Sequence, residues 1–168
     1  VAGVFAGGTR PLNRSMRHIR PWIENGGHFV SQYHRPIDNW DKTQSAPLRL
    51  QPGSPSIRWR VTDAAAPVRM LQPDHPLLNS PNRIANEDFD GWVKERGLYF
   101  ASEWDPAYVP LLAMSDTDEP PLEGSLLAAR IGAGGHIHCA LNLFYQMDHM
   151  VVGAFRLFAN LMTPSGRT

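Results

Sequence analysis

An amphipathic helical pattern between two apolar runs constrains the fold of this chain more than any other feature of its sequence. The apolar positions recur at spacings of four, three and four residues, as one face of a helix requires; they are Leu12, Met16, Ile19 and Ile23. Gly26-Gly27 is the expected C-terminal stop, and Pro21 should either kink the helix or begin its last turn. The flanking runs Val1–Phe5 and His28–Tyr33 are typical of strands. Because such strand–helix–strand units form parallel pairs with right-handed crossovers, the pattern predicts an α/β fold.

The rest of the chain predicts short strands joined by turns, one short helix and a closing helix. Val109–Met114 and Ser125–Ile131 flank the acidic turn DTDEPP and should pair antiparallel. The other expected strands are 57–61, 67–71, 98–101 and 135–144. The expected helices are a short one from Asn86 to about Glu95 and a final one over Val151–Met162, with Val152, Phe155, Leu157, Phe158 and Leu161 mostly buried.

Two polar segments lack periodicity and are expected to be loops, the long stretch 35–56 and the shorter stretch 102–106. The element order is therefore strand–helix–strand, then several strands with one short helix, then a strand and a helix. This order predicts a three-layer α/β sandwich with a mostly parallel sheet and an antiparallel insertion.

Composition and charge exclude several classes of protein. Sixteen lysines and arginines balance sixteen aspartates and glutamates, so no net field attracts nucleic acid or an anionic membrane. The sequence has no apolar run of about 18 residues, the length that would predict a membrane-spanning helix. Cys139 is the only cysteine, which excludes an intrachain disulfide and a thiolate metal cluster and suits a reducing, cytoplasmic location.

At 168 residues the chain is expected to form one domain, residues 1–168, whose core is large enough to be stable without disulfide bonds or a structural metal. It begins VAGVF, without a methionine and without the basic region of a signal peptide. This beginning is typical of the end of a strand, and we expect the domain to be a fragment of a longer protein.

The densest group of chemically active side chains directly follows the strand expected at 28–33, in the stretch SQYHRPIDNWD. Ligands of open α/β sheets bind beyond the carboxyl ends of the strands, where this stretch would lie. The candidate ligand-binding residues are therefore Tyr33, His34, Arg35, Asp38 and Trp40.

Two tryptophans, Trp40 and Trp104, lie in polar loops, and each has carboxylates beside it. A tryptophan in such a place suits a sugar ring, because its apolar face stacks on the ring while its neighbours bond the hydroxyls. Glu103 and Trp104 are accordingly candidate partners of the first group. The more ordinary interpretation is that each tryptophan packs its own loop onto the core.

No catalytic nucleophile is predicted. A nucleophile elbow needs a serine or cysteine on a tight, glycine-flanked turn, whereas residues 33–36 read YHRP and Ser31 lies inside the expected strand. Cys139 lies within HIHCALNLF, where a small buried residue is the expected role. The rival hypothesis is an enzyme in which His34 acts as general base and Asp38 or Glu103 orients it.

Neither a metal nor a cofactor is predicted. His136 and His138 lie two residues apart on one strand face, but a third ligand would have to come from elsewhere, and no His-Glu-x-x-His motif is present. Gly7-Gly8 precedes the first helix, where anions bind, yet it lacks both the G-x-G-x-x-G pattern and a P-loop lysine. Gly132–Gly135 is expected to be a hairpin turn.

The segment HPLLNSPNRIANEDFDGWVKERGLYFASEWDPAYVPLLAMSD, together with the later GAFRLFANLM, resembles a C-terminal region of some multidomain bacterial proteins of the PIG-L (LmbE-like) deacetylase family. The resemblance extends from TRPLNRSM to the final helix and is densest over residues 75–115. That region is similar to class I glutamine amidotransferase domains, which have a flavodoxin-like α/β fold.

The resemblance transfers no catalytic residue. The zinc site of that family carries a His-Pro-Asp-Asp type motif in an N-terminal deacetylase domain, whereas His75-Pro76 is followed here by two leucines. The amidotransferase Cys-His-Glu triad is also absent, because Tyr33 or His34 stands where the cysteine would be.

The resemblance implies a noncatalytic accessory or ligand-binding domain of a protein that deacetylates N-acetylated sugars. Its expected partners are an N-terminal deacetylase domain of the same protein and a carbohydrate ligand. Two alternatives stay open: the His34 enzyme acting on a small substrate, and an oligomerisation domain whose exposed strand or final helix pairs with a copy of itself.

Overall fold

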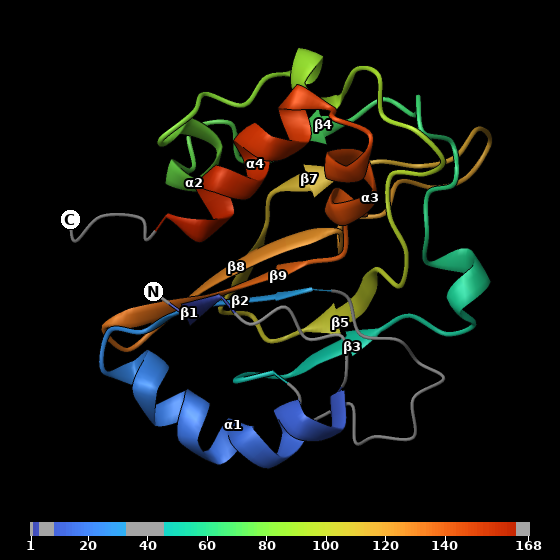
Figure 1. The fold of residues 1–168 in the computed structure, drawn as a ribbon. Coiled ribbons are helices and arrows are strands. Elements are labelled where there is room, and N and C mark those ends of the chain that lie inside the picture. The colour runs from blue at the N-terminus through green and yellow to red at the C-terminus, as the bar shows by residue number, and fades with distance from the viewer. Residues whose placement is uncertain (1, 4–8, 33–45, 164–168) are drawn as a thin grey trace.

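A five-stranded mixed sheet runs through the middle of the molecule in this computed structural model, which describes residues 2–3, 9–32 and 46–163, with side chains for 14–32 and 46–163 (Figure 1). Its strands, in spatial order, are β1 (Ala2–Gly3), β2 (His28–Gln32), β9 (Gly134–Cys139), β8 (Leu126–Ile131) and β6 (Tyr108–Pro110). The pairs β1–β2 and β2–β9 are parallel, while β9–β8 and β8–β6 are antiparallel. Two small antiparallel sheets complete the strands, β3 (Leu50–Pro52) with β5 (Ala101–Trp104) and β4 (Arg69–Met70) with β7 (Leu112–Ala113).

The predicted strand–helix–strand unit is confirmed. Helix α1 covers Thr9–Glu24 between the parallel strands β1 and β2, and Met16 and Ile23 of its apolar stripe are buried. Pro21 begins the last turn of the helix. Gly26 has a φ of +105°, a conformation that glycine adopts without a Cβ penalty, and its amide donates to the Ile23 carbonyl to end the helix.

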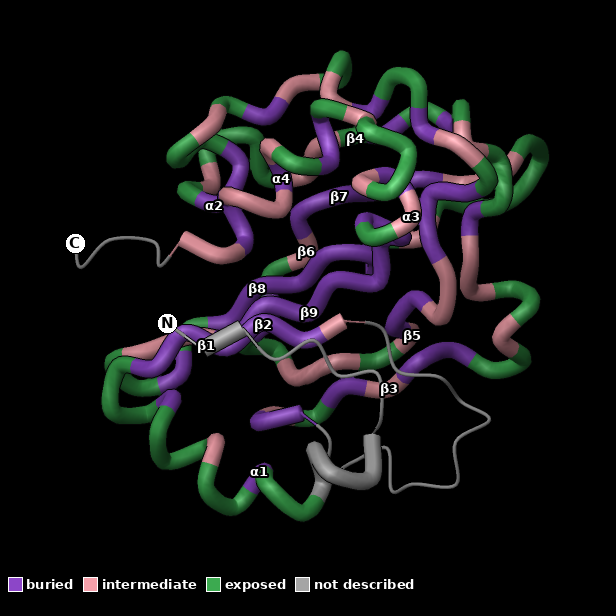
Figure 2. The backbone as a smooth tube through the Cα atoms, viewed as in Figure 1, coloured by how far each residue is buried: buried purple, intermediate pink, exposed green. Residues whose placement is uncertain are grey.

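The main sheet separates two apolar clusters, because alternate residues of each strand point to opposite faces. On one face Phe29, Leu127 and Ala129 pack with α1. On the other face Val30 and Ile137 pack with α3 (Leu143–Asp148) and α4 (Val152–Met162). Helices therefore cover both faces of the sheet, and its strands β2, β8 and β9 are buried along most of their length (Figure 2).

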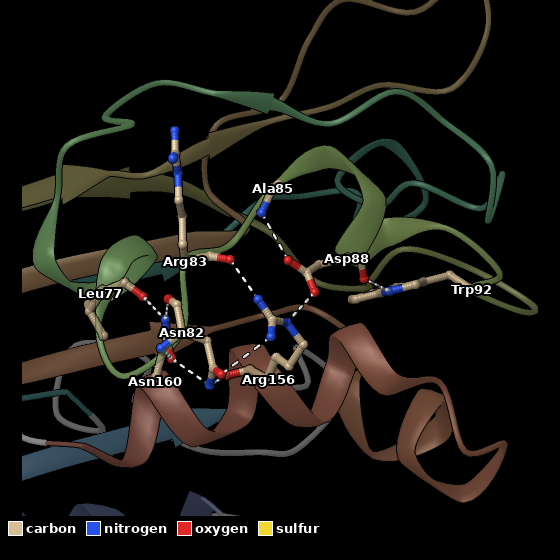
Figure 3. Close-up of polar contacts among 8 residues, drawn as sticks. All are labelled: Leu77, Asn82, Arg83, Ala85, Asp88, Trp92, Arg156 and Asn160. Atoms are coloured by element: carbon tan, nitrogen blue, oxygen red, sulfur yellow. Dashed lines mark hydrogen bonds and ion pairs between the residues drawn. The ribbon is translucent and has the colours of Figure 1, made fainter.

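Helix α4 is bonded to the neighbouring loops by a polar network that includes a fully buried asparagine (Figure 3). Asn160 donates to the carbonyl oxygens of Leu77 and Asn82, at 2.9 and 2.7 Å, and accepts from the Asn82 amide at 2.9 Å. Arg156 pairs with Asp88 at 2.7 Å. The network holds the short helix α2 (Pro76–Asn79) and the 3₁₀ turn η2 (Asn86–Phe89) against α4.

Several predictions of strand pairing and secondary structure are wrong. Among the described strands the sheet is not mostly parallel, because β8 and β9 form the hairpin expected at Gly132–Gly135 and β6 returns antiparallel along β8. The strands β6 and β8 thus belong to the main sheet, while β3 with β5 and β4 with β7 form two small antiparallel sheets outside it. The predicted helix from Asn86 to about Glu95 is only the turn η2, and the strand predicted at 135–144 ends at Cys139, before α3.

Other predicted boundaries differ because edge strands carry little local signal. The predicted loops at 35–56 and 102–106 contribute β3 and most of β5. The strand predicted at 57–61 instead begins with the 3₁₀ turn η1 (Ser56–Arg58), where Ile57 is 62% exposed, and only Val61 forms a bridge, antiparallel to Gly97. The final helix lies where it was predicted, but Val152 and Phe155 are 70% and 42% exposed, whereas both were expected inside.

Replacing Asn160 by leucine should destabilise the fold strongly. Leucine has a similar volume but leaves the Leu77 and Asn82 groups buried without partners, so the free energy of unfolding should fall by at least about 2 kcal/mol. Urea unfolding followed by circular dichroism measures this change. The exposed Asn86, replaced by alanine, is the control and should stay within about 0.5 kcal/mol of the wild type. Equal effects of the two substitutions would contradict the role given to Asn160.

Candidate functional site

The predicted site residues divide into two groups. Glu103 and Trp104 belong to β5 and are described. The stretch after β2 lies outside the described residues, and the predictions that fall on it concern Tyr33, His34, Arg35, Asp38 and Trp40. The structure therefore does not test whether the two groups meet.

Glu103 and Trp104 point to opposite faces of β5 and have different surroundings. Glu103 is exposed and forms an ion pair with Arg49. Trp104 is partly buried, packs against the apolar cluster beside α1 and is paired with Leu50 of β3. The interpretation of Trp104 as a residue that packs its own segment onto the core is thus the better one.

A groove of about 950 Å³ lies between α1 and the segment 46–49. Its lining includes the buried side chains of Met16 and Ala46, which belong to the apolar cluster on this face. Polar and charged side chains make up most of the rest, and those that carry charge are Arg14, Arg17, Arg20, Glu24, Arg49 and Asp105. A concave surface with an apolar part and converging polar groups suits a small polar ligand.

The charges of the groove do not cancel. Four of its charged residues are arginines and two are acids. Arg20 pairs with Glu24 at 3.2 Å, and Arg49 pairs with Glu103. Within the described part of the chain neither of the other two groove arginines has a carboxylate within ion-pair distance. The groove therefore carries positive charge at the Arg14–Arg17 side of α1.

One wall of this groove, the arginine side of α1, could be predicted from the sequence. Arg14, Arg17 and Arg20 are spaced three residues apart in a predicted helix, which places them along one side of it. The opposite wall had no such signal, because Arg49 and Asp105 come together only through the antiparallel contact of their backbones, where the Asp105 amide donates to the Arg49 carbonyl at 2.8 Å.

A buried polar cluster lies on the same face of the sheet, at the centre of three strands. The Ser31 hydroxyl lies 2.8 Å from Nε2 of His136 and 3.3 Å from Nδ1 of His138. The Tyr108 hydroxyl lies 2.6 Å from Nδ1 of His136. The Phe29 ring stacks on the same imidazole, with the two ring centroids 4.9 Å apart. All four polar side chains are buried, and Ser31 and His136 are 0% exposed.

The Tyr108 hydroxyl stays protonated at neutral pH. Burial raises the pKa of Tyr108 well above its ordinary value, as does the nearby Asp105 charge, while a hydrogen bond with the Leu48 backbone opposes them.

A catalytic serine and its base must be reachable by a substrate, whereas Ser31 and both histidines are buried. The cluster is therefore better explained as a hydrogen-bonded brace between β2, β9 and β6 than as a catalytic site. Sequence analysis missed the cluster because Ser31 and His136 are 105 residues apart.

Cys139 and the two strand histidines all lie on β9. Cys139 is buried, as expected for a small core residue, and burial raises the pKa of its thiol to about 12. His136 and His138 share one face of β9, with Ser31 beside both. Among the described residues no group of three histidine, cysteine, aspartate or glutamate side chains is placed to hold a metal ion. No helix in the described ranges is long and apolar enough to cross a membrane.

Comparisons with known proteins give a fold and no family. Neither a protein-family model nor a curated protein sequence matches the chain. Among solved structures, the cytoplasmic protein STM3548 from Salmonella typhimurium is similar, with a TM-score of 0.53 and 14% identity over 91% of this chain. The exo-β-1,4-mannosidase Op5Man5 from Opitutaceae bacterium strain TAV5 has a TM-score of 0.46 and 15% identity over 90% of this chain.

The likeness to STM3548 supports a mixed α/β fold and nothing about activity, because 14% identity is too low to transfer a function. The matched part is 61% of the length of STM3548 and 23% of the length of the mannosidase. The present chain thus corresponds to only part of each of these larger proteins.

Two buried serines allow a matched test of the brace. Ser31→Ala should lower the free energy of unfolding by about 1–3 kcal/mol, because it removes a hydrogen-bond partner from His136 and another from His138. Ser125 is equally buried, but its hydroxyl has no hydrogen-bond partner among the described residues. Ser125→Ala should therefore be neutral or stabilising in the same urea titration. A similar loss in both variants would argue against the brace.

Proposed function

We propose that this chain is a noncatalytic, ligand-binding accessory domain of a longer protein. The observation that carries the proposal is the contrast between an open, polar groove beside α1 and a serine–histidine cluster that is closed to solvent. Binding needs an accessible surface, and catalysis needs an accessible reacting group. Within the described residues the groove meets the first requirement and the cluster does not meet the second.

The size and lining of the groove favour a small polar ligand such as a sugar. Its volume of about 950 Å³ is at the upper end of the range of small-molecule sites. The apolar part formed by Met16 and Leu48 can contact the C–H face of a sugar ring, while the guanidinium and carboxylate groups bond its hydroxyls. The carbohydrate context comes from the resemblance to proteins of the PIG-L deacetylase family.

The same resemblance supports the finer features of the proposal. The fold would be a flavodoxin-like, class I glutamine amidotransferase-like domain that has lost the catalytic triad, and its partner would be an N-terminal deacetylase domain of the same bacterial protein. A cytoplasmic location agrees with the description of the structural neighbour STM3548. The enzyme hypothesis based on His34 stays a prediction, because that residue lies outside the described ranges.

Sugar binding to the groove can be measured by isothermal titration and ligand-observed NMR. The probes are glucose, N-acetylglucosamine, glucuronate and glucose 6-phosphate, and we expect at least one to bind in the millimolar range or tighter. Glu24→Trp should weaken that binding at least tenfold, because the indole would fill one end of the groove without removing a positive charge.

The control for this experiment is Glu119→Trp, which makes the same chemical change at an exposed turn away from the groove. It should leave the affinity unchanged. Absence of binding for all four probes, or equal affinity of Glu24→Trp and the wild type, would refute the proposed binding function.

A second candidate function, self-association, is favoured by the exposed apolar residues around α4. Met150 and Val152 are 75% and 70% exposed, and Phe144 and Phe155 are also exposed. Large apolar side chains that gather on a surface favour burial against another surface. Sedimentation equilibrium should then give a dimer that Val152→Glu combined with Phe155→Glu returns to a monomer. A monomer at every wild-type concentration would exclude this candidate.

A further inference from the structure

We propose that the groove selects anionic ligands, small sugars that carry a phosphate or a carboxylate, and that Arg14 and Arg17 bind the anionic group. This inference rests on the proposed binding function and adds the class of ligand. It is carried by the charge of the groove, by the way α1 is held and by the distribution of charge along that helix.

The charge of the groove is concentrated at one place. Arg20 and Arg49 each have a carboxylate partner, so their charges are largely compensated. Arg14 has no such partner among the described side chains, and the one described hydrogen bond of the Arg17 side chain goes from its Nε to Nε2 of His18, at 3.0 Å. Among the described residues no carboxylate competes for the guanidinium NH₂ groups of Arg14 and Arg17, which can bond an anion that enters the groove.

Helix α1 fixes the backbone under these two arginines. Met16 lies between them in the sequence and is buried, and Ile23 further along the helix is 0% exposed. Because the apolar stripe is packed on the sheet, the row of residues at 14 and 17 is held against the groove. Two guanidinium groups three residues apart on a helix are neighbours and can bond one oxyanion together.

The charge pattern of α1 is unfavourable for the helix alone. Its first turn has no acidic residue and its last turn has no basic residue, so it lacks the end charges that the helix dipole favours. Residues 18 and 21, four positions after Arg14 and Arg17, are histidine and proline instead of acids, whereas Arg20 does have Glu24 at that spacing. The positive charges of Arg14 and Arg17 repel each other on this face of the helix. An anion bound in the groove would relieve that repulsion.

The acidic groups of the groove suit the other end of such a ligand. Asp105 accepts from the Ala107 amide at 2.9 Å through one carboxylate oxygen, which leaves acceptor capacity on the other. Glu24 lies at the far end of α1 from Arg14. A sugar that places its anionic group at the arginines can then donate a hydroxyl hydrogen to Asp105. The two kinds of charge in one groove therefore match a polyhydroxylated anion better than a neutral sugar.

The test compares wild type, the double variant Arg14→Gln/Arg17→Gln and the control double variant Arg58→Gln/Arg130→Gln. The control loses the same two charges at exposed positions outside the groove. Isothermal titration at low salt should show that glucose 6-phosphate and glucuronate bind wild type at least tenfold more tightly than glucose. The groove variant should lose this preference and keep the weak binding of glucose, and the control should resemble the wild type.

The outcomes separate this inference from the proposed function. The anion inference is wrong if glucose binds as tightly as the two charged sugars, or if the groove variant still binds the charged sugars more tightly than glucose. Sugar binding stands in either case. If none of the sugars binds, both proposals fail. Inorganic phosphate serves as a further probe: binding as tight as that of glucose 6-phosphate would overturn the sugar part of the inference. The inference is supported if phosphate binds more weakly than glucose 6-phosphate and if added salt lowers the affinity for both charged sugars.

Discussion

The parallel pairing of β2 with β9 is the interaction on which the rest of the structure depends. It joins His28–Gln32 to Gly134–Cys139, and every other strand of the main sheet is attached through one of these two. A parallel pair brings together segments that are distant in sequence, so its loop-closure cost is high and side-chain contacts must offset it. Ser31 supplies two of these contacts, because its hydroxyl lies within hydrogen-bond distance of both His136 and His138 of β9. The same pairing creates the two faces on which α1 and α4 pack.

The parts of the fold that could be predicted are those whose signal is local. The stripe that includes Met16 and Ile23, the glycines after α1 and the hairpin before β9 each lie within one short stretch of sequence, and the structure contains all three. The edge strands β3 and β5 could not be predicted, because Leu50–Pro52 is held by its partner and not by its own alternation. Ile57 shows the reverse error: its alternating neighbours suggest a strand, but no partner strand lies beside it among the described elements.

The candidate site was predictable to a smaller extent, since it is assembled from distant segments. The spacing of Arg14 and Arg17 is visible in the sequence, but only the fold brings the segment 46–49 and Asp105 opposite them. The stretch after β2 attracted attention because it is rich in functional side chains, and richness alone says nothing about accessibility. Ser31, at the end of that strand, shows this: its hydroxyl lies beside two histidines, as that of a nucleophile would, yet its complete burial gives it a structural role.

The buried brace and the open groove are physically connected through Leu48. The Leu48 side chain lines the groove, and its backbone hydrogen-bonds the Tyr108 hydroxyl, which in turn bonds His136 and, through it, Ser31. One wall of the groove is thus tied to the centre of the sheet by a chain of hydrogen bonds, while the other wall is α1, which packs on the same face. A binding surface whose walls are both anchored in one core loses little conformational entropy when a ligand enters. In the proposed binding function, the buried histidines help to hold the groove in shape.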